Sequence, residues 1–63
     1  MRFHAFICDQ WGNALEMKDM DCESVSEAMQ RAQRMVIDRP LELWNGPRRM
    51  GRFTPKDWPF QAL

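Results

Sequence analysis

The sequence has no tyrosine, one histidine and three hydroxyl side chains, which leaves little material for catalysis. Nucleophilic catalysis needs a hydroxyl or thiol within hydrogen-bond reach of a base. His4 and Cys8 are the nearest such pair, but four residues of extended strand hold them roughly 13 Å apart. We therefore expect no catalytic residues and a protein that is not an enzyme.

Cysteine is also scarce, since Cys8 and Cys22 are the whole complement, whereas a secreted disulfide scaffold usually carries four or more. No C-x-x-C pair supplies a zinc site, and no glycine-rich loop supplies a phosphate site. No apolar run approaches the roughly 20 residues of a membrane span, and no signal-peptide pattern opens the chain. We expect a cytoplasmic protein with reduced thiols, no metal, no cofactor and no membrane contact.

Charge is balanced overall but unevenly placed along the chain. Residues 1–30 hold two basic and six acidic side chains, whereas residues 31–63 hold seven basic and three acidic ones. Such asymmetry can steer a partner or favour self-association. Alternatively, the two halves interleave in the fold and their fields largely cancel.

Hydrophobic periodicity predicts a hairpin followed by a helix. Residues 2–9 and 14–20 alternate with period two around a turn at 10–13, which is typical of paired strands. Ser24 and Glu27 then form a capping box, and helical spacing continues until Pro40 forbids it. We predict a helix over residues 24–37.

A second hairpin is predicted over residues 41–53 from the Asn45-Gly46 pair, a strong hairpin signal. Pro47 has no N–H to close a two-residue loop at that position, so a loop of three or four residues is expected. The register stays open, and one slip would exchange the faces of the return strand.

The order ββαββ predicts an α+β two-layer domain, with an antiparallel sheet of two hairpins and one helix on one face. The single domain spans residues 1–63, with a core at 2–53 and an extended C-terminal arm at 54–63. That arm either packs on its own core or grips a neighbouring molecule.

The sheet face away from the helix is expected to be too apolar for solvent. Seven apolar side chains are expected to face the helix: Phe3, Ala5, Ile7, Leu15, Met17, Leu41 and Leu43. The opposite face is expected to carry His4, Phe6, Cys8, Met20, Glu42 and Trp44. Its occupant would be the arm, a second copy of the chain or a ligand.

These patterns favour a small non-catalytic binding module that forms a homodimer, or binds a protein partner, through the aromatic sheet face. Large apolar and aromatic side chains dominate binding energy at interfaces. The expected anchors are Phe6, Met20, Trp44, Trp58 and Phe60.

A nucleic-acid-binding protein is the alternative. Arg48, Arg49 and Arg52 share the second hairpin with Trp44, and arginine with a stacking aromatic suits single-stranded nucleic acid. The pI near 6.5 weighs against it, because such domains are usually basic.

The second hairpin resembles that of a group of small uncharacterised bacterial proteins with a closing E-L-W-x-G-x-R hairpin. The matching residues are Glu42, Leu43, Trp44, Gly46 and Arg48, and the likeness extends over residues 2–53. The resemblance implies a small ββαββ protein of the bacterial cytoplasm and carries no known activity.

Overall fold

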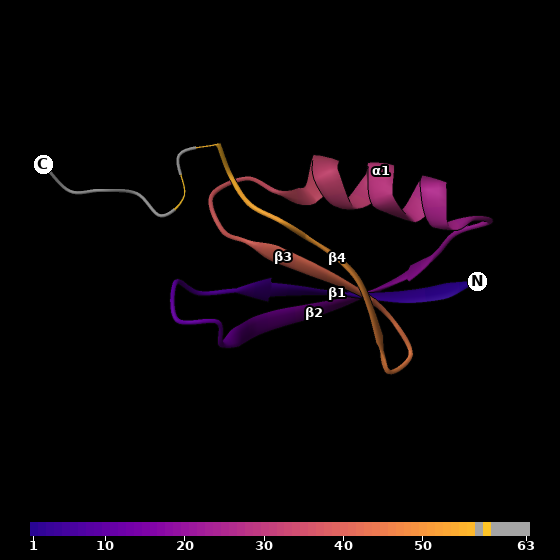
Figure 1. Ribbon diagram of the computed structural model, residues 1–63, viewed down its shortest axis with the longest axis horizontal. Helices are drawn as coiled ribbons and strands as arrows, with labels where there is room; N and C mark the ends of the chain where they lie inside the picture. Colours follow the sequence, from indigo (N-terminus) through magenta and orange to yellow (C-terminus); the bar gives the residue numbers. More distant parts are fainter. Residues whose placement is uncertain (57, 59–63) are drawn as a thin grey trace, which may run out of the picture.

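The two hairpins form one antiparallel sheet in a computed structural model that describes residues 1–56 and 58 (Figure 1). The elements are β1 (Arg2–Cys8), β2 (Ala14–Asp21), α1 (Val25–Met35), β3 (Leu41–Asn45) and β4 (Arg48–Phe53). Within the described residues these four strands lie in the order β2-β1-β3-β4, and α1 is the one helix. The predicted α+β fold with the order ββαββ is confirmed.

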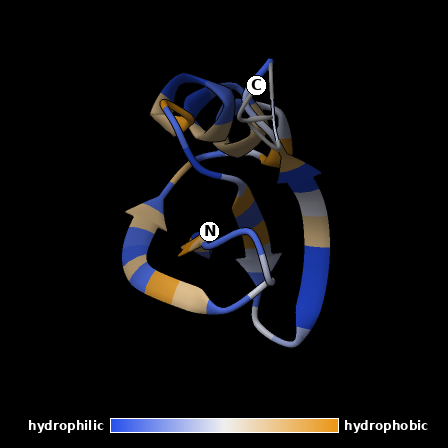
Figure 2. Cartoon of the chain, turned by 90° about the vertical axis from the view of Figure 1, so that its left-hand side faces the viewer, coloured by the Kyte–Doolittle hydropathy of each residue, from blue (hydrophilic) through white to orange (hydrophobic). Residues whose placement is uncertain are grey.

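The two hairpins join along their inner strands, β1 and β3. Ala5 pairs with Leu43 and Ile7 with Leu41, so β1 and β3 are antiparallel neighbours and β2 and β4 are the sheet edges. This pairing sends the two hairpin turns to opposite ends of the sheet (Figure 1). The helix lies on one side of the strands, packed mainly over β3 and β4 (Figure 2).

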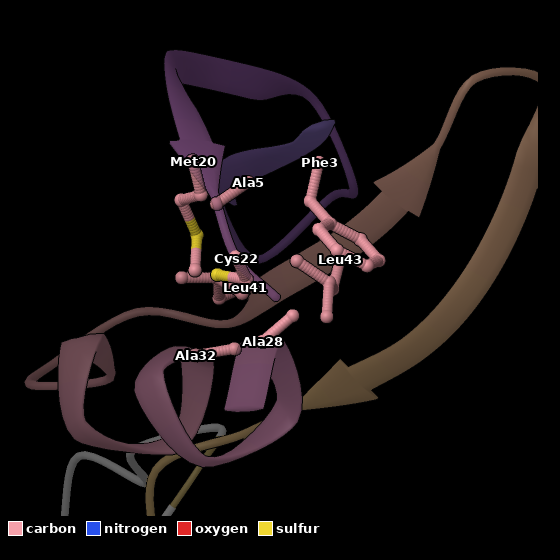
Figure 3. Close-up of a cluster of buried hydrophobic side chains, with 8 residues drawn as sticks. All are labelled: Phe3, Ala5, Met20, Cys22, Ala28, Ala32, Leu41 and Leu43. Carbon is pink, nitrogen blue, oxygen red and sulfur yellow. The ribbon is translucent and has the colours of Figure 1, made fainter. Parts of the chain in front are cut away.

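The core lies between the helix and one face of the sheet (Figure 3). Its fully or nearly fully buried members are Phe3, Ala5, Met20, Cys22, Ala28, Ala32, Leu41 and Leu43. The two helix residues are alanines, and their small side chains allow the helix backbone to approach the sheet. Gly51 on β4 adds to this close approach, because a Cβ there would lie 3.3 Å from Cε of Met29.

The prediction for β2 was wrong about its faces. Phe3 pairs with Met20 and Phe6 with Met17, and residues directly opposite in a sheet share a face. Met20 therefore enters the core, with 5% of its surface exposed, whereas Met17 points away from the helix and is 53% exposed. Leu15, the extra residue at the bulge near the turn, is equally exposed instead of facing the helix.

The helix begins as predicted and ends two residues early. Ser24 is its N-cap, and the Ser24 Oγ accepts a hydrogen bond from the Glu27 N–H at 3.1 Å. Oε2 of Glu27 accepts a hydrogen bond from the N–H of Glu23, at 3.3 Å. A standard capping box would use the N–H of the N-cap Ser24, so this bond is shifted by one residue. At the other end Val36 is already extended, which starts the passage into β3.

The second turn is shorter than predicted. Asn45 pairs with Arg48, so the loop has two residues, Gly46 and Pro47, one position later than Asn-Gly would place it. Gly46 takes the positive φ of 60°, which glycine adopts readily, and Pro47 sits where no ladder N–H is needed. A bulge between Leu43 and Trp44 shifts the register by one further residue, so that Leu43 pairs with Gly51.

The described part of the C-terminal arm starts beside the end of the helix. Thr54, Pro55 and Lys56 line a surface hollow of about 470 Å³ together with Val36 and Ile37. Pro55 is buried. This beginning of the arm therefore lies on the helix side of the sheet.

Two of the expected anchors belong to the same arm. Trp58 is half-buried, and its backbone N–H donates a hydrogen bond to the carbonyl of Pro55 at 3.1 Å. Phe60, the other expected anchor in the arm, lies outside the described residues. In the part of the chain that the structure describes, no helix has the length and apolar character needed to cross a bilayer.

Candidate functional site: the open sheet face

The candidate site is the sheet face turned away from the helix, which we call the open face. Strand register defines it, because residues paired across neighbouring strands lie in rows on one face. One row reads Asp19, His4, Trp44 and Arg49 from β2 to β4. The next row reads Met17, Phe6, Glu42 and Arg52.

An aromatic pair occupies the centre of the open face. The rings of Phe6 and Trp44 meet edge to face, with centroids 6.4 Å apart and planes at 88°. This T-shaped arrangement is a favourable one for aromatic side chains. Both residues are only half-buried, so the pair presents an apolar surface to the outside.

Glu42 connects the aromatic pair to the basic edge. Its Oε1 accepts a hydrogen bond from Nε1 of Trp44 at 3.1 Å, and its Oε2 lies 3.8 Å from Nη1 of Arg49. The carboxylate thus lies between the indole and the guanidinium on the same face. Arg52, which pairs with Glu42 across the strands, extends the basic edge along β4.

The acidic edge lies on β2, at the other side of the open face. Nδ1 of His4 and Oδ1 of Asp19 are 2.7 Å apart, which joins β1 to β2. Asp21 lies next to Asp19 along the same face of β2 and pairs with Arg2. The open face therefore runs from carboxylates on β2, across an aromatic centre, to arginines on β4.

A shallow groove crosses this face between the two hairpin turns. Its volume is about 320 Å³, and its walls are mostly apolar. The lining residues are His4, Phe6, Cys8, Gly12, Ala14, Glu42, Trp44 and Gly46. Apolar, exposed hollows of this kind are typical of binding surfaces rather than of solvated sheet faces.

The thiol at the floor of the groove is unsuited to act as a nucleophile. Cys8 is 3% exposed, and burial raises its pKa, with the nearby carboxylate of Glu42 raising it further against the opposing effect of Arg52. The thiol is therefore protonated at neutral pH, whereas a reactive cysteine needs a thiolate. Cys8 acts here as a small apolar side chain.

The first hairpin turn, whose Gly12 lines the groove, holds an exposed tryptophan. Oδ1 of Asp9 accepts hydrogen bonds from the N–H groups of Trp11 and Asn13, at 2.9 and 2.8 Å. Desolvation alone would raise the pKa of Asp9, but the Asn13 and Trp11 hydrogen bonds outweigh it and the pKa is lowered. The ordered turn leaves Trp11 77% exposed.

The open face combines some of the predicted site residues and excludes others. Phe6 and Trp44 lie together as predicted, and Arg49 shares their face. Met20 was wrongly assigned to this face, because its partner Phe3 belongs to the core. Arg48 pairs with Asn45 and so lies on the other side of the sheet from Trp44.

Sequence reasoning missed one apolar residue that the structure adds to this surface, Met17. Alternation in β2 indicated two faces but not which one the helix would cover, so Met17 was assigned to the wrong side. The described residues contain no group of three or more His, Cys, Asp or Glu side chains that could hold a metal ion.

No protein-family model matches this chain, and no curated protein or solved structure matches it either. The geometry of the open face is therefore the main indication of function.

Proposed function

We propose that this protein is a small, non-catalytic interaction module of the bacterial cytoplasm that forms a homodimer through its open face. The observation that carries the proposal is the half-buried Phe6–Trp44 pair at the centre of a groove with mostly apolar walls. A solvated antiparallel face alternates with polar side chains, whereas this one exposes Phe6, Trp44 and Met17 in adjoining rows.

Further features support a partner of this kind. A 63-residue domain buries a smaller share of its surface than larger domains do, so covering the aromatic face would add stability that the monomer lacks. The protonated thiol of Cys8 fits a binding surface rather than a catalytic one. The likeness of the closing hairpin to small bacterial proteins supports the proposed compartment.

Trp44→Ala is expected to weaken self-association by about thirtyfold or more, because truncating a central interface tryptophan typically costs 2 kcal/mol or more. Light scattering on a sizing column, over a dilution series at low and high salt, measures the effect. The wild-type dimer should persist at high salt, since its centre is apolar.

The matched control for Trp44→Ala is Ile37→Ala, which truncates a side chain that is 85% exposed at the end of the helix. It should leave the dimer unchanged. If Trp44→Ala keeps its circular dichroism spectrum and associates as tightly as the wild type, the proposed interface is wrong. A wild type that stays monomeric at every concentration would also overturn the homodimer.

Single-stranded nucleic acid is the second candidate partner, and the register of β4 favours it. Arg49 and Arg52 lie in the rows of Trp44 and Phe6, so phosphate contacts and base stacking would share one face. The acidic edge on β2 opposes this function, because Asp19 and Asp21 repel phosphate on the same surface.

If nucleic acid is the partner, affinity for a labelled single-stranded oligonucleotide should fall steeply with salt. Arg52→Ala should reduce the slope of that dependence, whereas Arg34→Ala on the exposed surface of the helix should not. Fluorescence anisotropy measures both. No binding at low salt would remove this candidate.

A further inference from the structure

The open face carries opposite charges at its two sides, and this layout defines how a second copy would sit. Asp19 and Asp21 lie on β2, while Arg49 and Arg52 lie on β4. Both Asp19 and Arg49 are more than half exposed, at 62% and 55% of their side-chain surface. Their charges are therefore available to a molecule seated on the face.

Three kinds of two-fold dimer are compatible with one sheet, and charge separates them. An axis along the sheet normal would join like edges, β2 to β2 or β4 to β4. An axis across the strands would stack β2 on the β2 of the other copy. Both arrangements bring carboxylates to carboxylates or arginines to arginines, which is unfavourable.

An axis parallel to the strands, lying between the two sheets, reverses the strand order of the second copy. It places β2 of one copy over β4 of the other and leaves each row facing itself in reverse. The row Asp19, His4, Trp44, Arg49 then meets Arg49, Trp44, His4, Asp19. Such a two-fold interface must be complementary to itself, and this row is.

We propose that the partner of the open face is a second copy of this chain, related by a two-fold axis parallel to the strands. Asp19 of each copy then pairs with Arg49 of the other, and His4 stacks against Trp44 across the interface. The spacing is suitable, because face-to-face sheets lie about 10 Å apart and both charged side chains are long enough to meet between them. This inference rests on the proposed function.

Charge reversal tests the arrangement directly. Asp19→Arg and Arg49→Asp should each weaken the dimer by at least about tenfold, since each change acts twice in a symmetric dimer and puts like charges together. The double variant should recover affinity to within about threefold of the wild type, because the pairs are restored with their signs exchanged.

Rescue in the double variant cannot arise inside one chain. Asp19 and Arg49 stand at opposite ends of a row, three strand spacings or roughly 14 Å apart. The single changes also remove the local contacts with His4 and Glu42, so circular dichroism and urea unfolding of each variant serve as the check on folding. Lys18→Asp, on the other side of β2, is the matched charge control and should leave affinity unchanged.

Cysteine cross-linking gives a second readout that does not depend on affinity. Asp19→Cys and Arg49→Cys are made as separate proteins, mixed, and treated with a short bis-maleimide, while the native Cys8 and Cys22 are buried. A spacer is needed because facing sheets lie about 10 Å apart, whereas a disulfide needs Cα atoms within about 7 Å. The mixture should form cross-linked dimers of the two variants faster than either variant alone. Equal rates in all three samples would overturn the proposed axis.

The outcomes separate the two proposals. A wild type that dimerises, but whose double variant is no tighter than the single variants, overturns the orientation and leaves the homodimer standing. A wild type that never dimerises overturns both. A dimer weakened by each single change and restored by both supports the axis parallel to the strands.

Discussion

Phe3→Ala is expected to remove about 3–5 kcal/mol from the free energy of unfolding, which is about a third or more of what this chain has. Phe3 is the largest of the fully buried side chains, with no exposed surface, and it packs among β1, β3 and the helix. A domain of 63 residues is stable by only about 3–9 kcal/mol, so the variant should unfold at a much lower urea concentration than the wild type.

Urea unfolding followed by far-UV circular dichroism measures this loss. The protein is kept dilute, because dimerisation would add to the apparent stability. Phe6→Ala is the matched control, since it removes the same ring from the neighbouring, half-buried position on the open face. If Phe6→Ala costs the dilute protein as much as Phe3→Ala, the open face is not the exposed side of the sheet.

Met20→Ala is expected to cost about 2–5 kcal/mol, whereas Met17→Ala should change the stability of the dilute protein by no more than about 0.5 kcal/mol. The two methionines lie on the same strand and lose the same atoms. Met20 is buried opposite Phe3, and Met17 is exposed opposite Phe6. The comparison therefore measures which face of β2 the core covers.

The same two substitutions distinguish an effect on stability from an effect on self-association. Met17→Ala should weaken the dimer in light scattering while it leaves the urea midpoint of the dilute protein in place. Equal destabilisation by both substitutions would contradict the register of the first hairpin. A larger loss of stability for Met17→Ala would place Met17 in the core and Met20 on the open face, as the sequence pattern predicted.

The helix shows how much local sequence can predict. Ser24 and Glu27 carry the signal for its start in their own side chains, and the hydrogen bond between them is present. Ala28 and Ala32 recur at helical spacing and are both buried. These features depend on contacts within a few residues, so they could be predicted without knowing the rest of the fold.

The hairpins show what local sequence signals cannot predict. Alternation assigns residues to two faces, but it does not say which face the helix will cover. The bulge beside Cys8 and the two-residue loop at Gly46-Pro47 set the registers, and each depends on how the turn closes. For this reason Met20 was assigned to the wrong face and the side of Arg49 stayed open.

The sequence by itself determined the order of the elements, the helix cap, the alternation of the strands and the excess of apolar side chains over what one helix can cover. Only the tertiary structure decided that β1 and β3 meet in the middle, because strand pairing joins residues far apart in the chain. That pairing puts Asp19 and Arg49 at opposite ends of one row, with His4 and Trp44 between them. The self-complementary row is thus a product of register, which the sequence encodes only through the closure of its turns and the packing of its core.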